Sequence, residues 1–146
     1  HDHHGHYSLA SKMILDYPIF GTGVKGFRYL CRNKIYILEN SDGCSTHPHN
    51  TYIQIFSSNG IVGLVLIIIA FFYLSKEIIR IRKKINLEEN FNKFEVSRII
   101  LLSTIFVNIW PLIPSGNFFN NWLSMMYFYP IGYYLYFKHI DEKKIN

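Results

Sequence analysis

The chain has 146 residues, of which 49% are apolar, and it carries a formal net charge of +5. Ten of its 15 Lys and Arg residues lie in two stretches, 76–98 and 138–144, next to apolar segments. A nucleic-acid interface gathers such charges on one face with interleaved aromatic side chains, so this distribution argues against a nucleic-acid partner. Basic residues beside apolar segments are typical of the cytoplasmic flanks of membrane helices.

Residues 6–16 are the first segment with a helical pattern, because Leu9 and Met13 recur at a helical spacing. The predicted helix ends at Tyr17-Pro18, since the residue before a proline avoids the α conformation. We therefore expect a short amphipathic helix near the start of the chain.

A glycine-rich segment follows at 21–26, with Gly21, Gly23 and Gly26 in the pattern G-x-G-x-x-G. That pattern binds dinucleotides when it joins a buried strand to a helix, with an acidic residue about 20 positions later. Here a helix and a proline precede it and no parallel-strand pattern follows, so we reject that interpretation. The glycines predict tight turns or a close approach of the backbone to another group.

Cys31 and Cys44 are the two cysteines of the chain, and the charge pattern places both outside the cytoplasm. A disulfide between them would close a loop of about 14 residues and contribute roughly 3 kcal/mol. Two unrelated buried thiols are the alternative. A metal site is less well supported, because the sequence has no C-x-x-C spacing. We favour a disulfide that restrains the loop before His47.

The segment 46–54 contains His47, Pro48, His49 and Asn50. Pro48 favours an extended His47, and Asn50 is a good N-cap for a helix that begins at Thr51. His49 then precedes a helix N-terminus, whose positive end favours a neutral imidazole that can accept a proton. The same end is expected to offer N–H groups to an anion such as pyrophosphate. In the alternative interpretation, both histidines are ordinary interface residues that bond to backbone groups.

Three apolar stretches predict membrane-spanning helices, at about 60–79, 99–113 and 121–137. The basic loop 76–98 and the tail 138–146 then face the cytoplasm, and residues 1–59 form an outer helical and loop region. We expect an all-α integral membrane fold. No initiator methionine or signal-peptide pattern is present at the start, and we expect the chain to be the C-terminal part of a longer protein.

The pair His49-Asn50, nine further residues and then Gly60-x-x-Gly63 resemble the signature of the O-antigen ligase/polymerase family. Segment 17–27 resembles the element that precedes the catalytic loop in this family, and segment 111–122 resembles the outer loop between its last two helices in polymerase-like members. An arginine that the family often carries would fall near His3 in this chain, where no arginine is present.

The resemblance implies an inverting, metal-independent glycosyltransferase in the inner membrane of a bacterium, within a larger polytopic fold of the GT-C type. It implies a glycan donor linked to undecaprenyl pyrophosphate, an acceptor glycan or lipid, and no cofactor. The product would be lipopolysaccharide or another surface polysaccharide, and polymerisation and ligation both fit the pattern. His49 is the expected catalytic residue. The expected substrate-binding residues are Lys25, Arg28, His3, His6, His47 and Asn50, and Gly21, Gly23, Gly60 and Gly63 are expected to shape the backbone.

Two other functions remain open from the sequence. A His-rich tract can bind zinc or copper, and a metal-binding or metal-transport module would use histidines at both ends of the outer region: His1, His3, His4, His6, His47 and His49. Such a site needs four ligands in a fixed geometry. The other function is that of a structural membrane subunit without catalysis.

Overall fold

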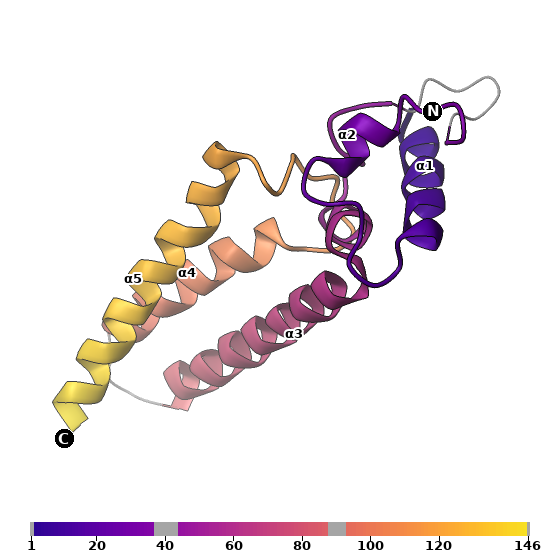
Figure 1. The fold of residues 1–146 in the computed structure, drawn as a ribbon. Helices are drawn as coiled ribbons and strands as arrows, with labels where there is room; N and C mark the ends of the chain where they lie inside the picture. The colour runs from indigo at the N-terminus through magenta and orange to yellow at the C-terminus, as the bar shows by residue number, and fades with distance from the viewer. Residues whose placement is uncertain (1, 37–43, 88–92, 146) are drawn as a thin grey trace. The chain divides into compact units, whose positions relative to one another are not determined.

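The computed structural model describes residues 2–36, 44–87 and 93–145, and in these ranges it contains helices and loops but no strand. The helices are α1 (Asp2–Asp16), α2 (Gly26–Leu30), α3 (Thr51–Leu87), α4 (Lys93–Asn108) and α5 (Asn121–Ile145) (Figure 1). The predicted all-α class is confirmed for the described residues. The chain divides into two compact units: residues 1–69 with 111–123, and residues 70–110 with 124–146.

The first unit is built around α1, α2 and the beginning of α3. Leu9, Met13 and Phe27 are buried together, and Ile53 of α3 packs against this cluster. Helix α1 begins at Asp2, earlier than the sequence suggested, and it ends at Asp16, where the proline was expected to stop it. This packing holds His6 beside the segment that leads into α3.

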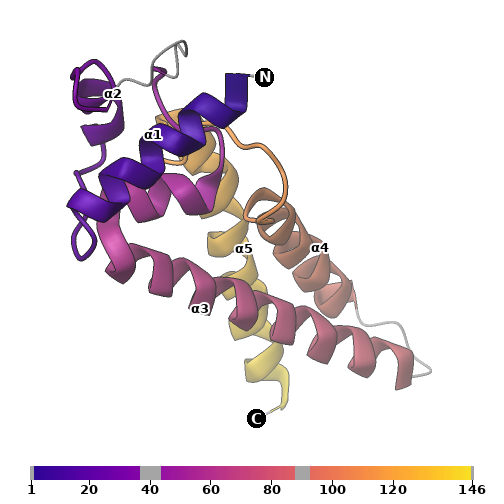
Figure 2. The ribbon, with the colours of Figure 1, turned by 90° about the vertical axis from the view of Figure 1, so that its right-hand side faces the viewer.

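Helix α3 is broken at Gly60, whose φ of 64° and ψ of −161° lie in a region that is essentially restricted to glycine. Figure 2 shows α3 changing direction at this point. The segment before the break contains Thr51, and the segment after it covers residues 61–87. The sequence had suggested one apolar span from Gly60 with a preceding helix, and the break is the boundary between the two.

The glycine-rich loop after α1 satisfies the backbone groups that the break leaves open. The amides of Thr22 and Gly23 donate to the carbonyls of Ser57 and Ser58 at 2.9 and 2.8 Å, and the amide of Ile61 donates to the carbonyl of Pro18 at 2.8 Å. A Cβ atom on Gly21 would collide with the backbone of Ser58, and one on Gly60 would collide with the carbonyl of Ile19. The glycines therefore permit a close backbone approach, which was one of the two roles that the sequence predicted.

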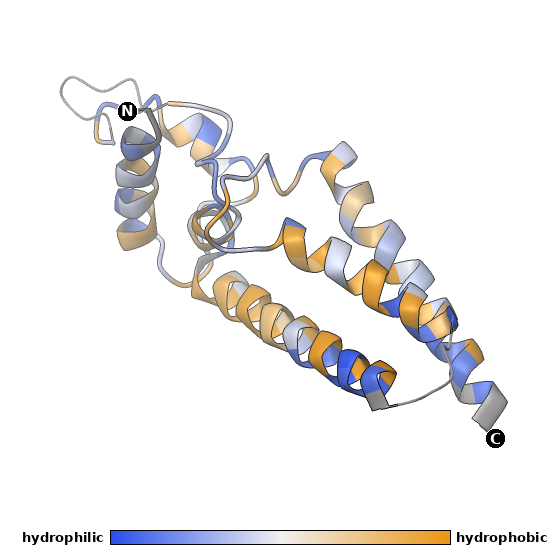
Figure 3. Cartoon of the chain, turned by 180° about the vertical axis from the view of Figure 1, so that it is seen from behind, coloured by the Kyte–Doolittle hydropathy of each residue, from blue (hydrophilic) through white to orange (hydrophobic). Residues whose placement is uncertain are grey.

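Among the described helices, α3 is the one that is long and apolar enough to cross a membrane, between Thr51 and Asn86. After the break it continues for roughly 40 Å, more than the ~30 Å of a hydrocarbon core. Many of its large apolar side chains are exposed: Val62, Val65, Leu66, Ile69 and Phe72. Figure 3 shows this part of α3 as a largely orange, hydrophobic stretch. Such a surface fits contact with lipid.

The second unit contains the rest of α3 together with α4 and most of α5, around the buried side chains of Ile81, Leu102 and Tyr134. The stretch 76–98 was expected to be a loop, but α3 continues to Leu87 and α4 begins at Lys93. Helix α4 ends at Asn108, before the prolines at 111 and 114, and its 16 residues reach only about 24 Å.

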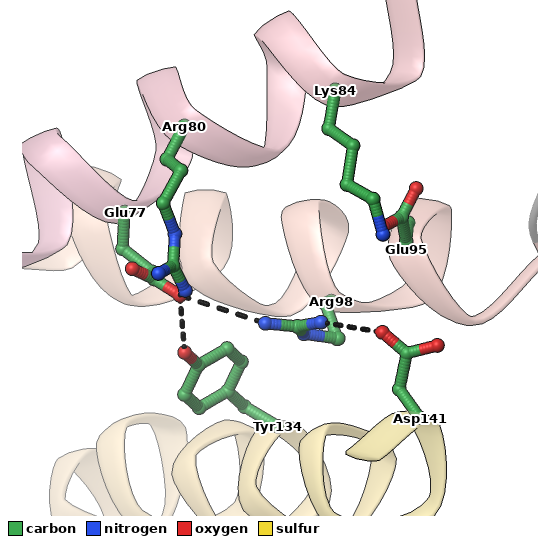
Figure 4. Close-up of polar contacts among 7 residues, drawn as sticks. All are labelled: Glu77, Arg80, Lys84, Glu95, Arg98, Tyr134 and Asp141. Carbon is green, nitrogen blue, oxygen red and sulfur yellow. Dashed lines mark hydrogen bonds and ion pairs between the residues drawn. The ribbon is translucent and has the colours of Figure 1, made fainter. Parts of the chain in front are cut away.

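Charged side chains join the three helices of this unit (Figure 4). Arg98 of α4 is buried and lies 3.5 Å from Glu77 of α3 and 3.0 Å from Asp141 of α5. The hydroxyl of Tyr134 donates to Glu77 at 3.0 Å. Arg80 also pairs with Glu77. The basic stretch 76–98, which the sequence analysis assigned to a cytoplasmic loop, therefore contributes Arg98 to a buried ion network.

Candidate functional site

Three histidines from two distant segments lie together in the first unit. The ring of His49 lies with its centroid 4.2 Å from that of His47 and 5.1 Å from that of His6. His6 comes from α1, and the other two come from the loop before α3. His6 and His47 are each 7% exposed, whereas His49 is partly exposed. His49 is thus the most accessible residue of the three, and it is the one that the sequence assigned to catalysis.

The backbone of His49 is in the left-handed region, with φ of 57°. Among the described residues it is the one non-glycine position with a positive φ. This conformation is uncommon for a residue with a Cβ atom and persists where surrounding contacts hold it. The amide of Ser115, in the loop between α4 and α5, donates to the carbonyl of His49 at 2.9 Å.

Asn50 caps α3 as predicted. Its Oδ1 accepts hydrogen bonds from the amides of Tyr52 and Ile53, at 3.0 and 3.1 Å. The sequence also suggested that this helix start would offer free N–H groups to pyrophosphate. That expectation is wrong for these two amides, because the cap already satisfies them. The side-chain Nδ2 of Asn50 donates to the carbonyl of Pro111 at 2.8 Å, so Asn50 also holds the α4–α5 loop.

His47 is held by hydrogen bonds on both ring nitrogens. Its Nε2 lies 3.2 Å from the carbonyl of Ser115, which can only accept, so Nε2 carries the hydrogen. In the neutral ring Nδ1 then accepts from the hydroxyl of Thr46, 2.9 Å away. Burial lowers the pKa of His47, while the Ser115 carbonyl acts in the opposite direction. These contacts resemble those of an ordinary buried histidine and favour a structural role.

The α4–α5 loop makes most of the remaining contacts with the start of α3. The hydroxyl of Thr51 donates to the hydroxyl oxygen of Ser115 at 2.8 Å. Gln54 is buried, with 2% of its surface exposed. Its Nε2 donates a hydrogen bond to Oδ1 of Asn117 at 2.6 Å, and its Oε1 accepts one from the amide of Phe118 at 2.9 Å. The sequence marked 111–122 as an outer loop, but it gave no signal that Ser115 and Gln54 connect this loop to the histidines.

The cationic residues suggested for substrate binding lie in and before α2. Lys25 lines a hollow of about 460 Å³ together with Tyr17, Gly23 and Tyr29. Arg28 is exposed on α2. The ring contacts of the histidine cluster involve His6, His47 and His49 and include neither Lys25 nor Arg28.

The other N-terminal histidines are less informative. His4 is exposed, the side chain of His3 lies outside the described part of the structure, and His1 lies outside it entirely. Within the described ranges, no group of three or more His, Cys, Asp or Glu side chains is arranged to hold a metal ion. The metal-module interpretation thus has no arranged ligand set in these ranges.

The structure joins Cys31 to Cys44 by a disulfide, with Cα atoms 5.1 Å apart. Cys31 is buried in the cluster that also contains Met13 and Phe27. Most of the loop that the bond would close, residues 37–43, lies outside the described residues. The bond ties α2 to the segment that leads to His47.

Comparison with known proteins gives one match. A family model described as O-Antigen ligase matches residues 6–68, which include His6, His49, Gly60 and Gly63. This match supports an O-antigen ligase-type function in surface polysaccharide biosynthesis, acting on lipid-linked glycans at a membrane. No curated protein matches the chain, and no solved structure does.

Proposed function

We propose that this chain belongs to the O-antigen ligase/polymerase family and that the protein is a glycosyltransferase that uses His49 to move a glycan from undecaprenyl pyrophosphate to an acceptor hydroxyl. The observation that carries the proposal is the placement of His49. Its ring is partly exposed beside two buried histidines, and its backbone is held in a left-handed conformation. Strained backbone at a partly exposed titratable side chain is a feature of functional sites.

The reaction in this proposal is a single displacement with inversion. The acceptor hydroxyl oxygen forms a bond to the anomeric carbon as the bond from that carbon to the pyrophosphate oxygen breaks. His49 takes the hydroxyl proton, and undecaprenyl pyrophosphate leaves with the bonding electron pair. A positioned histidine base typically contributes roughly 10²–10⁴-fold to the rate.

The leaving pyrophosphate requires positive charge or hydrogen-bond donors. In the proposal, Lys25 and Arg28 supply the charge, and the hollow beside Lys25 provides space for part of the substrate. In the proposal, His6 belongs to the same substrate site, and its ring centroid lies 5.1 Å from that of His49. Neither a metal ion nor a cofactor is part of this mechanism.

The proposed topology has three spans in the inner membrane of a bacterium, with residues 1–59 in the periplasm. The length and apolar surface of α3 support the first span. The basic residues at the end of α3 and after residue 137 support a cytoplasmic side for both stretches. The loop 111–119 contacts the His49 segment, which supports the same side for both.

The proposal is tested in cells that depend on the full-length protein for their surface glycan. We expect His49→Ala to abolish the mature glycan on gels and to cause the lipid-linked precursor to accumulate, at an unchanged protein level. His139→Ala is the matched control, because His139 is exposed on α5, and it should leave the glycan unchanged. Normal glycan from His49→Ala at equal expression would show that His49 is not catalytic.

A further inference from the structure

We propose that the loop 111–119 is a positioning element for His49 and that it acts through Ser115. The inference rests on the proposed function, since it assigns a task in the same reaction. The loop lies outside residues 6–68, the part of the chain that matches the family model. It is more than 60 residues away from His49 in the sequence, yet the two segments lie in one compact unit.

Ser115 contacts three residues around the proposed catalytic ring. Its amide donates to the carbonyl of His49 at 2.9 Å, and its carbonyl lies 3.2 Å from Nε2 of His47. Its hydroxyl oxygen accepts from Thr51 at 2.8 Å. One residue of the loop therefore fixes the backbone of His49, the ring beside it and the first residue of α3.

The contact with His49 matters because of that residue's backbone. A left-handed φ at a histidine returns to a more common region unless a partner holds the adjoining peptide. The Ser115 amide holds the carbonyl of the peptide that follows His49. Releasing it would let the ring move while the rest of the fold stays in place.

Two side chains at the start of α3 anchor the loop. Nδ2 of Asn50 donates to the carbonyl of Pro111, and Nε2 of Gln54 donates to Oδ1 of Asn117. Both hydrogen bonds end on the loop, so both side chains anchor it at the start of α3. Gln54→Glu has nearly the same shape, still accepts the amide of Phe118, and places a carboxylate against Oδ1 of Asn117. It therefore loosens the loop with little change in packing.

The test uses the full-length protein in nanodiscs with the undecaprenyl-pyrophosphate-linked glycan isolated from the cells that make it. We expect Gln54→Glu to lower kcat about 10- to 100-fold with KM within threefold of wild type, since small displacements of a reacting group cost rate rather than binding. Ser115→Pro, which removes the amide donor, should have a larger effect.

Asn108→Asp is the control for an amide-to-carboxylate change, because Asn108 donates within α4 to the carbonyl of Thr104. It should keep the wild-type kcat. If the Ser115→Pro protein does not fold, the kcat of Gln54→Glu alone tests the positioning role. An unchanged kcat in Gln54→Glu, with His49→Ala inactive, would overturn the positioning role and leave the proposed function standing. Activity in His49→Ala would overturn both.

Discussion

His47 and His49 are two positions apart and face different surroundings. His47 is 7% exposed and bonds through both ring nitrogens, whereas His49 is partly exposed on a left-handed backbone. A ring with both nitrogens occupied by the protein is poorly placed to exchange a proton with a substrate. This contrast supports the proposed division, in which His47 packs and His49 performs the chemistry.

The pH dependence of protein stability should show whether the His47 side chain is buried and neutral in the folded protein. Burial lowers its pKa in the folded chain, so below about 6.5 the unfolded chain binds more protons at this residue than the folded chain does. The stability that neutral His47 contributes is then fully present above pH 6.5, and it is lost as the pH falls toward the lowered pKa. We expect the Tm of the wild-type protein to fall as the pH is lowered from 7.5 to 5.5.

The variant His47→Gln removes this titration and should show a smaller fall in Tm over the same range. His139→Gln, at an exposed position, should reproduce the wild-type fall. An equal fall in His47→Gln and in the wild type would exclude His47 as a source of the pH dependence.

At the scale of elements, the break in α3 depends on one glycine. Gly60→Ala should destabilise the protein by roughly 1–3 kcal/mol from its backbone conformation alone, and by more because the new Cβ meets the carbonyl of Ile19. A Cβ atom on Gly132 in α5 would have no atom within 4 Å. Gly132→Ala should therefore leave the stability of the protein unchanged or raise it by about 0.5–1 kcal/mol. Thermal unfolding in detergent compares the two, and a Gly60→Ala protein as stable as wild type would mean that the break is not needed.

The ion network of the second unit gives another prediction at this scale. Arg98→Ala would leave Glu77 and Asp141 with less of their compensating charge, and breaking a buried ion pair costs about 3–5 kcal/mol. Arg82→Ala removes an exposed arginine of α3 and should change stability by less than about 0.5 kcal/mol. Equal unfolding temperatures for the two variants would show that the network contributes little.

The sequence predicted those element boundaries that depend on local chemistry. The proline after Tyr17 ends α1 at Asp16, and Asn50 begins α3 at Thr51. It did not predict the break in α3 or the extension of that helix to Leu87. The break depends on hydrogen bonds to a loop about 35 residues earlier. The extension lies in a segment whose Glu77 and Lys84 form ion pairs with Arg98 and Glu95 of α4.

Only the part of the candidate site that depends on local sequence could be predicted. His49 and Asn50 stand out because a capped helix and a family-like spacing are visible in the sequence. The approach of His6 to His49 and the contacts of Ser115 come from tertiary packing of distant segments. No local pattern encodes such contacts.

At the scale of the whole molecule, the proposed topology assigns each segment to one side of the membrane. Alkaline phosphatase fused at Asn117 should be active, and the same reporter after Leu87 or after residue 146 should be inactive. Cys31 and Cys44 provide an independent readout, because a periplasmic pair is oxidised. Mass spectrometry after alkylation without reductant should find them linked. Active phosphatase after Leu87, or free thiols in the native envelope, would contradict this orientation.

The central claim is that His49 performs the chemistry, and reconstitution tests it most directly. The purified full-length protein is placed in nanodiscs with its lipid-linked glycan and acceptor, and the release of undecaprenyl pyrophosphate is measured. We expect His49→Ala to lower the rate of release by at least about 10²-fold with unchanged thermal stability, and His47→Gln to retain most of the rate. A His49→Ala protein that releases undecaprenyl pyrophosphate at the wild-type rate would contradict the assignment.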